Sequence, residues 1–524
     1  MTCTTLLVGK NASYDGSTIV ARNEDSAAGE FTSKEVVAVR PEEQPHTYTS
    51  VIGHLTLELP DDPLRYLSVP DAPRTQGVWA AAGINAANVA MNATETIGNN
   101  ARVLGADPLV PYVPAKGTEG APDFEPARPG GLGEEDFVTV TLPYIRSARE
   151  GVERLGSLLA RHGTYEMNGI AFSDLDEVWW METVGGHHWI ARRVPDDCYV
   201  TMPNQLGIDS FNLLDAEGPR RDHMASADLR EWMAENHLCR AAGTRALAPA
   251  GALGVPDRFN PRVAFGTRSA SDHVYNTPRA WVMQRFLNPG ERWDGPDAPL
   301  GPESDDLPWC RVPEQPISIE DVKEALSLHY EGTGFDPYGA RGTAETCGRY
   351  RPVGINRTSH LAVLQLRPYV PAPLAGVQWI AFCSNPFNAL VPLFAQVERV
   401  PAYLTGTTDA VDSAGSFFWA SCLLGALADG SFRATGAWVA RYQEALAAFA
   451  HAHVRETDAA VRAALDEAAA TDAAGTDADA VRALLEEANE RMAAEAKRQT
   501  DAVLNRVLQI AVDHMRNRFA LSDN

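Results

Sequence analysis

Short runs of β-branched and apolar residues, separated by turn residues, make up much of the first hundred positions. We expect strands at Thr4–Val8, Ser17–Arg22, Glu35–Val39 and Val89–Ala93. Asp15-Gly16 lies between the first two runs, and an Asp-Gly pair between strand-like runs is typical of a hairpin. The first two strands are therefore predicted to be antiparallel neighbours.

Helical spacing first appears after a long stretch rich in proline and glycine. This stretch covers residues 106–133 and is expected to be a loop or lid. Glu134–Leu142 and Ser147–Arg161 then carry apolar residues at helical spacing. Strand-like runs resume at Gly169–Phe172, Glu177–Glu182, His188–Arg192 and Cys198–Met202. This succession of strands, helices and strands predicts an α+β fold built in layers.

The second half of the chain changes from irregular to strongly helical. Residues 240–315 are rich in Pro, Arg and Gly, which predicts irregular surface or cleft loops. Ser318 and Asp321 have the spacing of a capping box, so a helix is expected to run to about His329. From about residue 430 to 519 the chain is rich in Ala, which predicts two or three long helices with a break near 471–476. We therefore divide the chain into a body over residues 3–425 and a helical region over 426–524.

Charge and composition narrow the classes of partner. The chain has 524 residues, with 45 Lys+Arg against 69 Asp+Glu and a net charge of −24. This balance argues against nucleic acid or an anionic membrane as a partner. No apolar run approaches the ~18 residues of a membrane span, and no signal peptide is visible. We expect a cytoplasmic protein that forms a homo-oligomer.

The seven cysteines are scattered, and nothing near most of them indicates chemistry. They never come closer than 36 positions, which excludes a CxxC motif and argues against a disulfide framework. We expect free thiols in a reducing compartment. The chain also lacks HExxH, Walker, GxSxG and GxGxxG patterns, and His187-His188 is more typical of polar contacts than of a metal site. No metal site is predicted.

Cys3 is the cysteine whose surroundings suggest catalysis. A thiol attacks only as the thiolate, so a catalytic cysteine needs a base or a nearby cation. A cysteine at the very start of a mature chain can use its own α-amine, whose pKa is roughly 7.7–8.0. For Cys3 this requires removal of Met1 and Thr2.

The predicted hairpin brings two charged residues back toward Cys3. Its second strand leads into Arg22-Asn23-Glu24-Asp25. A cation at Arg22 would lower the thiol pKa, and the Asp25 carboxylate could hold the α-amine in place. The alternative interpretation is a surface salt bridge, worth about 0–1 kcal/mol.

These residues belong to a set of motifs that resembles a known family. Cys-Thr-Thr-x-Leu-Val-Gly-Lys at residue 3, Asp-Gly-Ser-Thr at 15 and Ala-Arg-x-Glu-Asp-Ser at 21 are similar to the start of the cysteine dipeptidases related to bacterial dipeptidase D. Further similar segments are 91–96, 186–189, 203–205, 275–279 and 329–333, so the resemblance covers at least residues 3–390. These enzymes belong to the N-terminal-nucleophile hydrolases, with penicillin acylases and bile-salt hydrolases.

The resemblance implies a fold, an activity and a set of catalytic residues. It implies a four-layer αββα sandwich, hydrolysis of a broad range of unblocked dipeptides, and no cofactor. Cys3 would be the nucleophile, Arg22 and Asp25 would position the thiol and the amine, and Asn204 would supply an oxyanion-hole amide. The segment from Asn92 to Glu95 would line the site, although the resemblance does not single out one of its members.

Dipeptides carry a free ammonium and a free carboxylate, so the pocket needs an acid at one end and a cation at the other. Glu24 or Glu95 could meet the ammonium. A downstream arginine could meet the carboxylate; Arg262, Arg268 and Arg279 compete for this role, and Arg279 is our candidate.

Two other classes of function compete with a dipeptidase. An N-acyl amide hydrolase of the penicillin or bile-salt type would need an apolar acyl pocket rather than charges at both ends. A non-catalytic interaction protein would use the acidic surface and the helical region. The set Cys3, Arg22, Asp25 and Asn204 argues against it, because an inert scaffold has no need of that combination.

Overall fold

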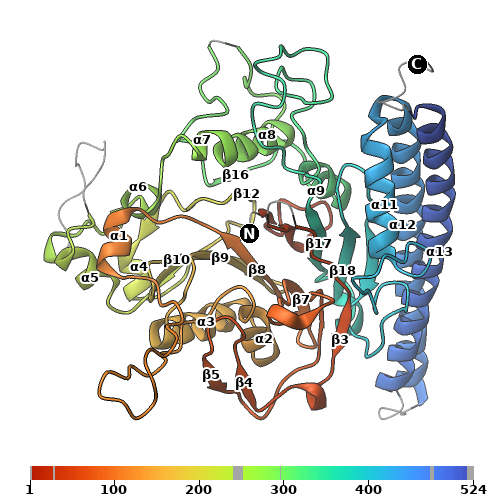
Figure 1. Cartoon of the computed structure of the whole chain (residues 1–524). Coiled ribbons are helices and arrows are strands. Elements are labelled where there is room, and N and C mark those ends of the chain that lie inside the picture. Colours follow the sequence, from red (N-terminus) through yellow and green to blue (C-terminus); the bar gives the residue numbers. More distant parts are fainter. Residues whose placement is uncertain (1–2, 28–29, 240–251, 296, 472–476, 516–524) are drawn as a thin grey trace.

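The computed structural model describes residues 3–27, 30–239, 252–295, 297–471 and 477–515 (Figure 1). Helices and antiparallel sheets both contribute, so the fold is α+β as predicted. Two large sheets form the centre of the molecule, and helices pack on both. In the described part of the chain, no helix is long and apolar enough to cross a membrane.

The seven-stranded sheet contains the N-terminal hairpin. Its order is β16-β12-β1-β2-β17-β18-β19. The strands are β1 (Thr4–Val8), β2 (Thr18–Asp25), β12 (Tyr199–Met202), β16 (Cys310–Arg311), β17 (Thr358–Leu366), β18 (Gly376–Phe382) and β19 (Val391–Phe394). Gly16, with φ of 83°, lies in the turn between β1 and β2, a conformation that glycine adopts without strain. The predicted hairpin is confirmed, with Thr5 opposite Arg22.

The eight-stranded sheet has the order β14-β11-β10-β9-β8-β7-β6-β3. Its strands are β3 (Val37–Val39), β6 (Tyr66–Ser68), β7 (Ala82–Asn85), β8 (Ala90–Thr96), β9 (Asn168–Ser173), β10 (Val178–Val184), β11 (His188–Arg193) and β14 (His223–Ala225). Two further hairpins pair β4 (Thr47–Thr49) with β5 (Thr56–Glu58), and β13 (Phe211–Asn212) with β15 (Arg258–Phe259).

The two sheets pack on each other and each carries helices. Strand β2 contacts β8, β9 and β10 of the other sheet. The helices are α1 (Ala101–Ala106), α2 (Phe137–Thr141), α3 (Ala148–His162), α4 (Leu213–Glu217), α5 (Leu229–Glu235), α6 (Pro261–Phe265), α7 (Asp272–Tyr275), α8 (Thr277–Leu287), α9 (Ile319–Ala325), α10 (Ala372–Ala375), α11 (Phe417–Asp429), α12 (Phe432–Thr471) and α13 (Asp477–Asp513). Helix α3 packs on β9, β10 and β11, whereas α11, α12 and α13 pack side by side against β18 and β19 (Figure 1).

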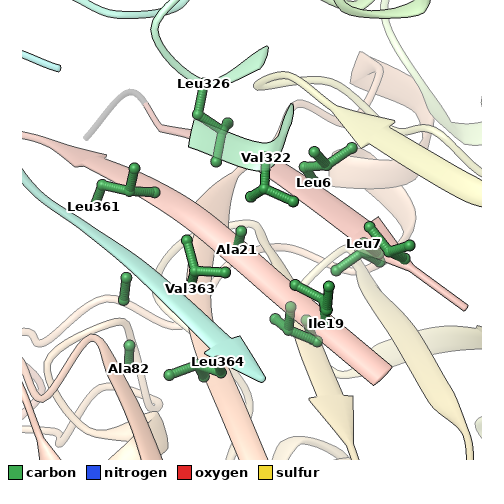
Figure 2. Packing of buried hydrophobic residues seen from close by; sticks show 14 of the residues in the cluster. Leu6, Leu7, Ile19, Ala21, Ala82, Val322, Leu326, Leu361, Val363 and Leu364 are labelled. Carbon is green, nitrogen blue, oxygen red and sulfur yellow. The ribbon is translucent and has the colours of Figure 1, made fainter. Parts of the chain in front are cut away.

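Apolar side chains from neighbouring strands hold the hairpin in place. Leu6, Ala21 and Val363 come from β1, β2 and β17, and all three are fully buried. Figure 2 shows them together with Val322 of α9. Full burial of one such aliphatic side chain contributes about 1.5–3 kcal/mol. The strand that carries Arg22 is therefore fixed by the core on both sides.

The structure departs from the sequence prediction in three places. Helix α9 has the predicted capping box at Ser318 and Asp321 but ends at Ala325, and Tyr330 beyond it has a positive φ of 70°. The stretch 252–315, predicted to be irregular, contains the eleven-residue helix α8, which is buried along most of its length and so shows little amphipathic spacing. Residues 240–251 of that stretch lie outside the described residues.

The third departure concerns the cysteines. Cys383, directly after β18, forms a disulfide with Cys422 of α11, with a Cα–Cα distance of 5.2 Å. The expectation of free thiols is therefore wrong for this pair. A separation of 39 residues carries no signal in the sequence, because only the packing of α11 on β18 brings the two together.

Candidate active site

Cys3 directly precedes β1 and is completely buried. Side chains alternate along a strand, so Cys3 and Thr5 share a face, and Arg22 opposite Thr5 points to that same face. The Arg22 guanidinium therefore reaches the thiol, and its Nη2 donates to Cys3 Sγ at 2.9 Å. The sequence-predicted pair of nucleophile and cation is in contact.

Arg22 also joins the two sheets. Its Nη1 donates to the carbonyl oxygen of Ala93 on β8 at 2.9 Å, and its Nη2 donates to Glu134 Oε1 at 2.5 Å. The guanidinium thus lies between a thiol and a carboxylate. The sequence predicted Glu134 as the start of a helix and gave no sign that it contacts Arg22.

Glu134 is the first of three consecutive buried acids, and each has its own partner. Glu135 accepts hydrogen bonds from Ser50 Oγ and the Ile52 amide, both at 2.6 Å. Asp136 accepts from the Tyr48 hydroxyl at 2.7 Å. Acidic residues are rarely buried unless they are paired. In the sequence, three acidic residues in a row directly after a glycine-rich stretch were the signal that could have marked this segment.

Electrostatics keep the Cys3 thiol protonated at neutral pH. Burial raises the pKa of the thiol to about 12, against the influence of the Arg22 guanidinium, and the charges of Glu134 and Glu95 raise it further. The cation alone is therefore insufficient to produce a thiolate. Chemistry at Cys3 requires a group that accepts the thiol proton.

Among the three competing arginines, the structure brings Arg279 to Cys3. Its Nη1 donates to the Cys3 carbonyl oxygen and, at 2.6 Å, to Thr4 Oγ1. Its Nη2 donates to Asn204 Oδ1 at 2.7 Å and to Asn276 Oδ1 at 2.9 Å, and its Nε donates to the Tyr275 carbonyl oxygen. All five N–H groups of Arg279 are thus engaged. Arg279 anchors the segment that carries Cys3 and the side chain of Asn204, so it has no N–H group left to bind a further carboxylate.

The other two candidate arginines lie in a different network. Arg262 donates to the carbonyl oxygens of Gly207, Asp305 and Leu307. Arg268 is exposed, and its Nη1 lies 3.9 Å from Asp305 Oδ2. The structure gives neither arginine a contact with Cys3 or its hydrogen-bond partners among the described residues.

The Asn204 carboxamide is held in one orientation. Its Oδ1 accepts from Arg279, and its Nδ2 donates to the Thr96 carbonyl oxygen at 2.8 Å. The bond to Thr96 uses one of the two hydrogens on Nδ2, so the second hydrogen takes no part in these two contacts. An amide fixed in this way is suited to donate to a developing oxyanion without reorganising.

Glu24 and Asp25 are the last two residues of β2, and each forms a buried ion pair of its own. Asp25 pairs with Arg351 in the loop before β17 and accepts from Oγ1 of Thr358, the first residue of β17, at 2.6 Å. Glu24 Oε1 lies 2.6 Å from Lys34 Nζ, and Glu24 Oε2 lies 3.1 Å from His360 Nδ1. Although burial opposes ionisation, Lys34 and His360 hold the pKa of Glu24 well below its ordinary value. Glu24 is thus already paired within the protein.

Glu95 and Asn92, both on β8, have polar atoms without partners. Glu95 Oε2 accepts from Thr5 Oγ1 at 2.9 Å. Among the described residues, Glu95 Oε1 and both carboxamide atoms of Asn92 are buried without a hydrogen-bond partner. Burial raises the pKa of Glu95 to about 8, although Arg279 and Arg22 oppose this shift. A buried polar group without a partner costs about 1–3 kcal/mol, so these atoms are suited to contact a bound molecule.

Comparisons with known proteins identify the family of the chain. The model of peptidase family C69 matches residues 2–445. The chain is 54% identical to a dipeptidase of Bifidobacterium longum over the full length of both. It is 47% identical to a probable dipeptidase A of Streptococcus pyogenes over 99% of this chain and 98% of the relative, and 42% identical to dipeptidase A of Lactobacillus helveticus over 88% and 89%. The chain belongs to peptidase family C69.

Proposed function

We propose that this protein is a dipeptidase that hydrolyses the peptide bond of a broad range of unblocked dipeptides through a thioester on Cys3. The contact between the buried Cys3 Sγ and Arg22 Nη2 carries the proposal. The names of the relatives support dipeptides as the substrate class. The contacts between α3 and one sheet, and between α11–α13 and the other, support a four-layer αββα sandwich.

The proposed base is the α-amine of Cys3, set free when Met1 and Thr2 are removed. The amine takes the thiol proton, and the thiolate attacks the carbonyl carbon of the dipeptide. Asn204 and a backbone N–H stabilise the oxyanion. When the C–N bond breaks, the resulting ammonium protonates the leaving amino acid. The amine then accepts a proton from water, which hydrolyses the thioester and restores the thiol.

Glu95, rather than Glu24, is the proposed receptor for the substrate ammonium. Glu24 Oε1 already forms a 2.6 Å ion pair with Lys34 Nζ. Among the described residues, Glu95 has no ion pair, and its Oε1 has no hydrogen-bond partner. An arriving ammonium favours the ionised form of a neighbouring carboxyl. Asn92, on the same strand, offers a carboxamide with both atoms unused and is proposed to line the same pocket. Charged and polar groups around Cys3 argue against the apolar pocket that an N-acyl amide hydrolase would need.

Hydrolysis of an unblocked dipeptide by the Cys3→Ala variant tests the proposal. We expect the variant to fold and to release no amino acids, and Cys3→Ser to retain little activity, because a hydroxyl is far harder to deprotonate than a thiol. Cys198→Ala, another buried free cysteine, is the matched control and should keep wild-type turnover. Substantial turnover by folded Cys3→Ala would refute the proposed function.

A further inference from the structure

A dipeptidase needs a cation for the substrate carboxylate, and the arginines that contact Cys3 or Asp25 are already engaged. Arg22 pairs with Glu134, and Arg351 pairs with Asp25. Arg279 uses all five of its N–H groups within the protein. The receptor for the carboxylate must therefore be a different residue.

Arg357 directly precedes β17 and lies beside Ser26, the residue after β2; its acceptors among the described residues are neutral. Its Nη1 donates to the Ser26 carbonyl oxygen and its Nη2 to the Tyr275 hydroxyl at 2.7 Å, and its own carbonyl oxygen accepts from the Ser26 amide at 2.9 Å. The residue is half-buried. Among the described residues, no carboxylate lies within ion-pair distance of it. Its charge is thus held in place without being compensated, which is unusual for an arginine that is partly removed from water.

The strand register places Arg357 at a suitable position relative to Cys3. Thr4 lies opposite Asn23, so the register extended by one residue puts Cys3 opposite Glu24. Ser26, the residue after β2, is two residues beyond Glu24, about 7 Å in the strand direction. The free carboxylate of a dipeptide lies one residue beyond the scissile carbonyl, about 3.6 Å in an extended chain. The Arg357 side chain has to cover the remaining separation.

Tyr275 connects this position to the nucleophile. The guanidinium groups of Arg279 and Arg351 lie 5.3 and 4.8 Å from the centre of its ring. Its carbonyl oxygen accepts from Arg279 Nε, and its hydroxyl accepts from Arg357. One aromatic residue thus fixes Arg357 relative to the arginine that holds Cys3.

We propose that Arg357 binds the C-terminal carboxylate of the substrate, which rests on the proposed dipeptidase function. Glu95 on the eight-stranded sheet and Arg357 beside β17 of the seven-stranded sheet then receive the two charged ends of one molecule. A longer peptide or a dipeptide amide presents a neutral amide at this position and leaves the cation without a partner. Arg357 therefore limits the enzyme to substrates with one residue after the scissile bond.

The test compares a dipeptide with its C-terminal amide as substrates. Arg357→Met should raise KM for the free acid about 10- to 100-fold, the range for loss of a hydrogen bond to a charged group, with little change for the amide. Arg357→Lys should keep part of the preference, because the charge remains but the bidentate geometry is lost. Arg349→Met, an exposed arginine of the same loop paired with Glu303, is the control and should behave as wild type.

Two results would overturn the proposal. Arg357→Met could raise KM for acid and amide alike, or it could leave the acid-to-amide ratio of kcat/KM unchanged. Arg357→Lys separates charge recognition from an effect on folding. If lysine restores hydrolysis of the free acid but does not change hydrolysis of the amide, the loss in Arg357→Met is a loss of charge recognition. Failure of the proposed function would look different, since wild-type protein would then hydrolyse neither substrate, or Cys3→Ala would hydrolyse both.

Discussion

Glu134→Gln should make the Cys3 thiol more acidic. Arg22 Nη2 lies 2.9 Å from Cys3 Sγ and 2.5 Å from Glu134 Oε1, so the sulfur and the carboxylate oxygen are at most about 5.4 Å apart. At an effective dielectric constant of about 20, two charges at this distance repel by about 3 kcal/mol. Glutamine removes the charge but can still accept a hydrogen bond from Arg22. The thiol pKa should therefore fall by about 2 units.

The rate of iodoacetamide alkylation at Cys3, followed by peptide mass across a pH series, measures this change. Below its pKa the thiol reacts in proportion to the thiolate fraction, which a fall of about 2 units raises about 100-fold. A thiolate of lower pKa is also a weaker nucleophile, with a Brønsted coefficient of about 0.5, so about tenfold of this gain is lost. Alkylation near neutral pH should accelerate about tenfold.

Glu135→Gln is the matched control. Glu135 is the adjacent residue and is equally buried, but its carboxylate accepts from Ser50 and the Ile52 amide rather than from Arg22. Its variant should alkylate at nearly the wild-type rate. If folded Glu134→Gln shows the wild-type pH profile, the carboxylate does not act on the thiol, and the electrostatic account of the site is wrong.

Asn204→Ala should lower kcat about 10²- to 10³-fold, because it removes an oxyanion donor, and a loss below twofold would exclude this role. Glu95→Gln should raise KM for dipeptides with a free ammonium about tenfold or more and leave inhibition by an N-formylated dipeptide unchanged; equal effects on both would remove Glu95 from ammonium recognition. EDTA should leave hydrolysis intact and iodoacetamide should abolish it, whereas the reverse pattern would indicate a metallopeptidase. The intact mass of active protein should lack Met1 and Thr2, and full activity with both residues attached would exclude the α-amine as the base.

Local sequence signals were sufficient for the hairpin and for its pair of site residues. Asp15-Gly16 specifies the turn, and the period of two along β1 and β2 then brings Arg22 to Cys3. The Ala-rich composition was likewise sufficient to predict the long helices α12 and α13, whereas residues 472–476 of the predicted break lie outside the described residues. These features depend on residues close together in the chain.

The rest of the site depends on contacts over long separations. Glu134 is 112 residues from Arg22, and Arg351 is 326 residues from Asp25. No local pattern in the sequence specifies such pairs. The sequence also could not tell whether Glu24 or Glu95 is free to bind a substrate ammonium. Lys34, from another part of the fold, forms an ion pair with Glu24 and not with Glu95.

The anchoring of Cys3 by Arg279 has a consequence for processing. Arg279 holds the Cys3 carbonyl oxygen and Thr4, and Arg22 holds the sulfur, so all three bonds lie on the C-terminal side of the peptide bond between Thr2 and Cys3. Cleavage of that bond leaves each of them in place. Processing would then add a proton acceptor to a site that is otherwise complete. The precursor would then be folded but inactive, because it would lack the free α-amine that accepts the thiol proton.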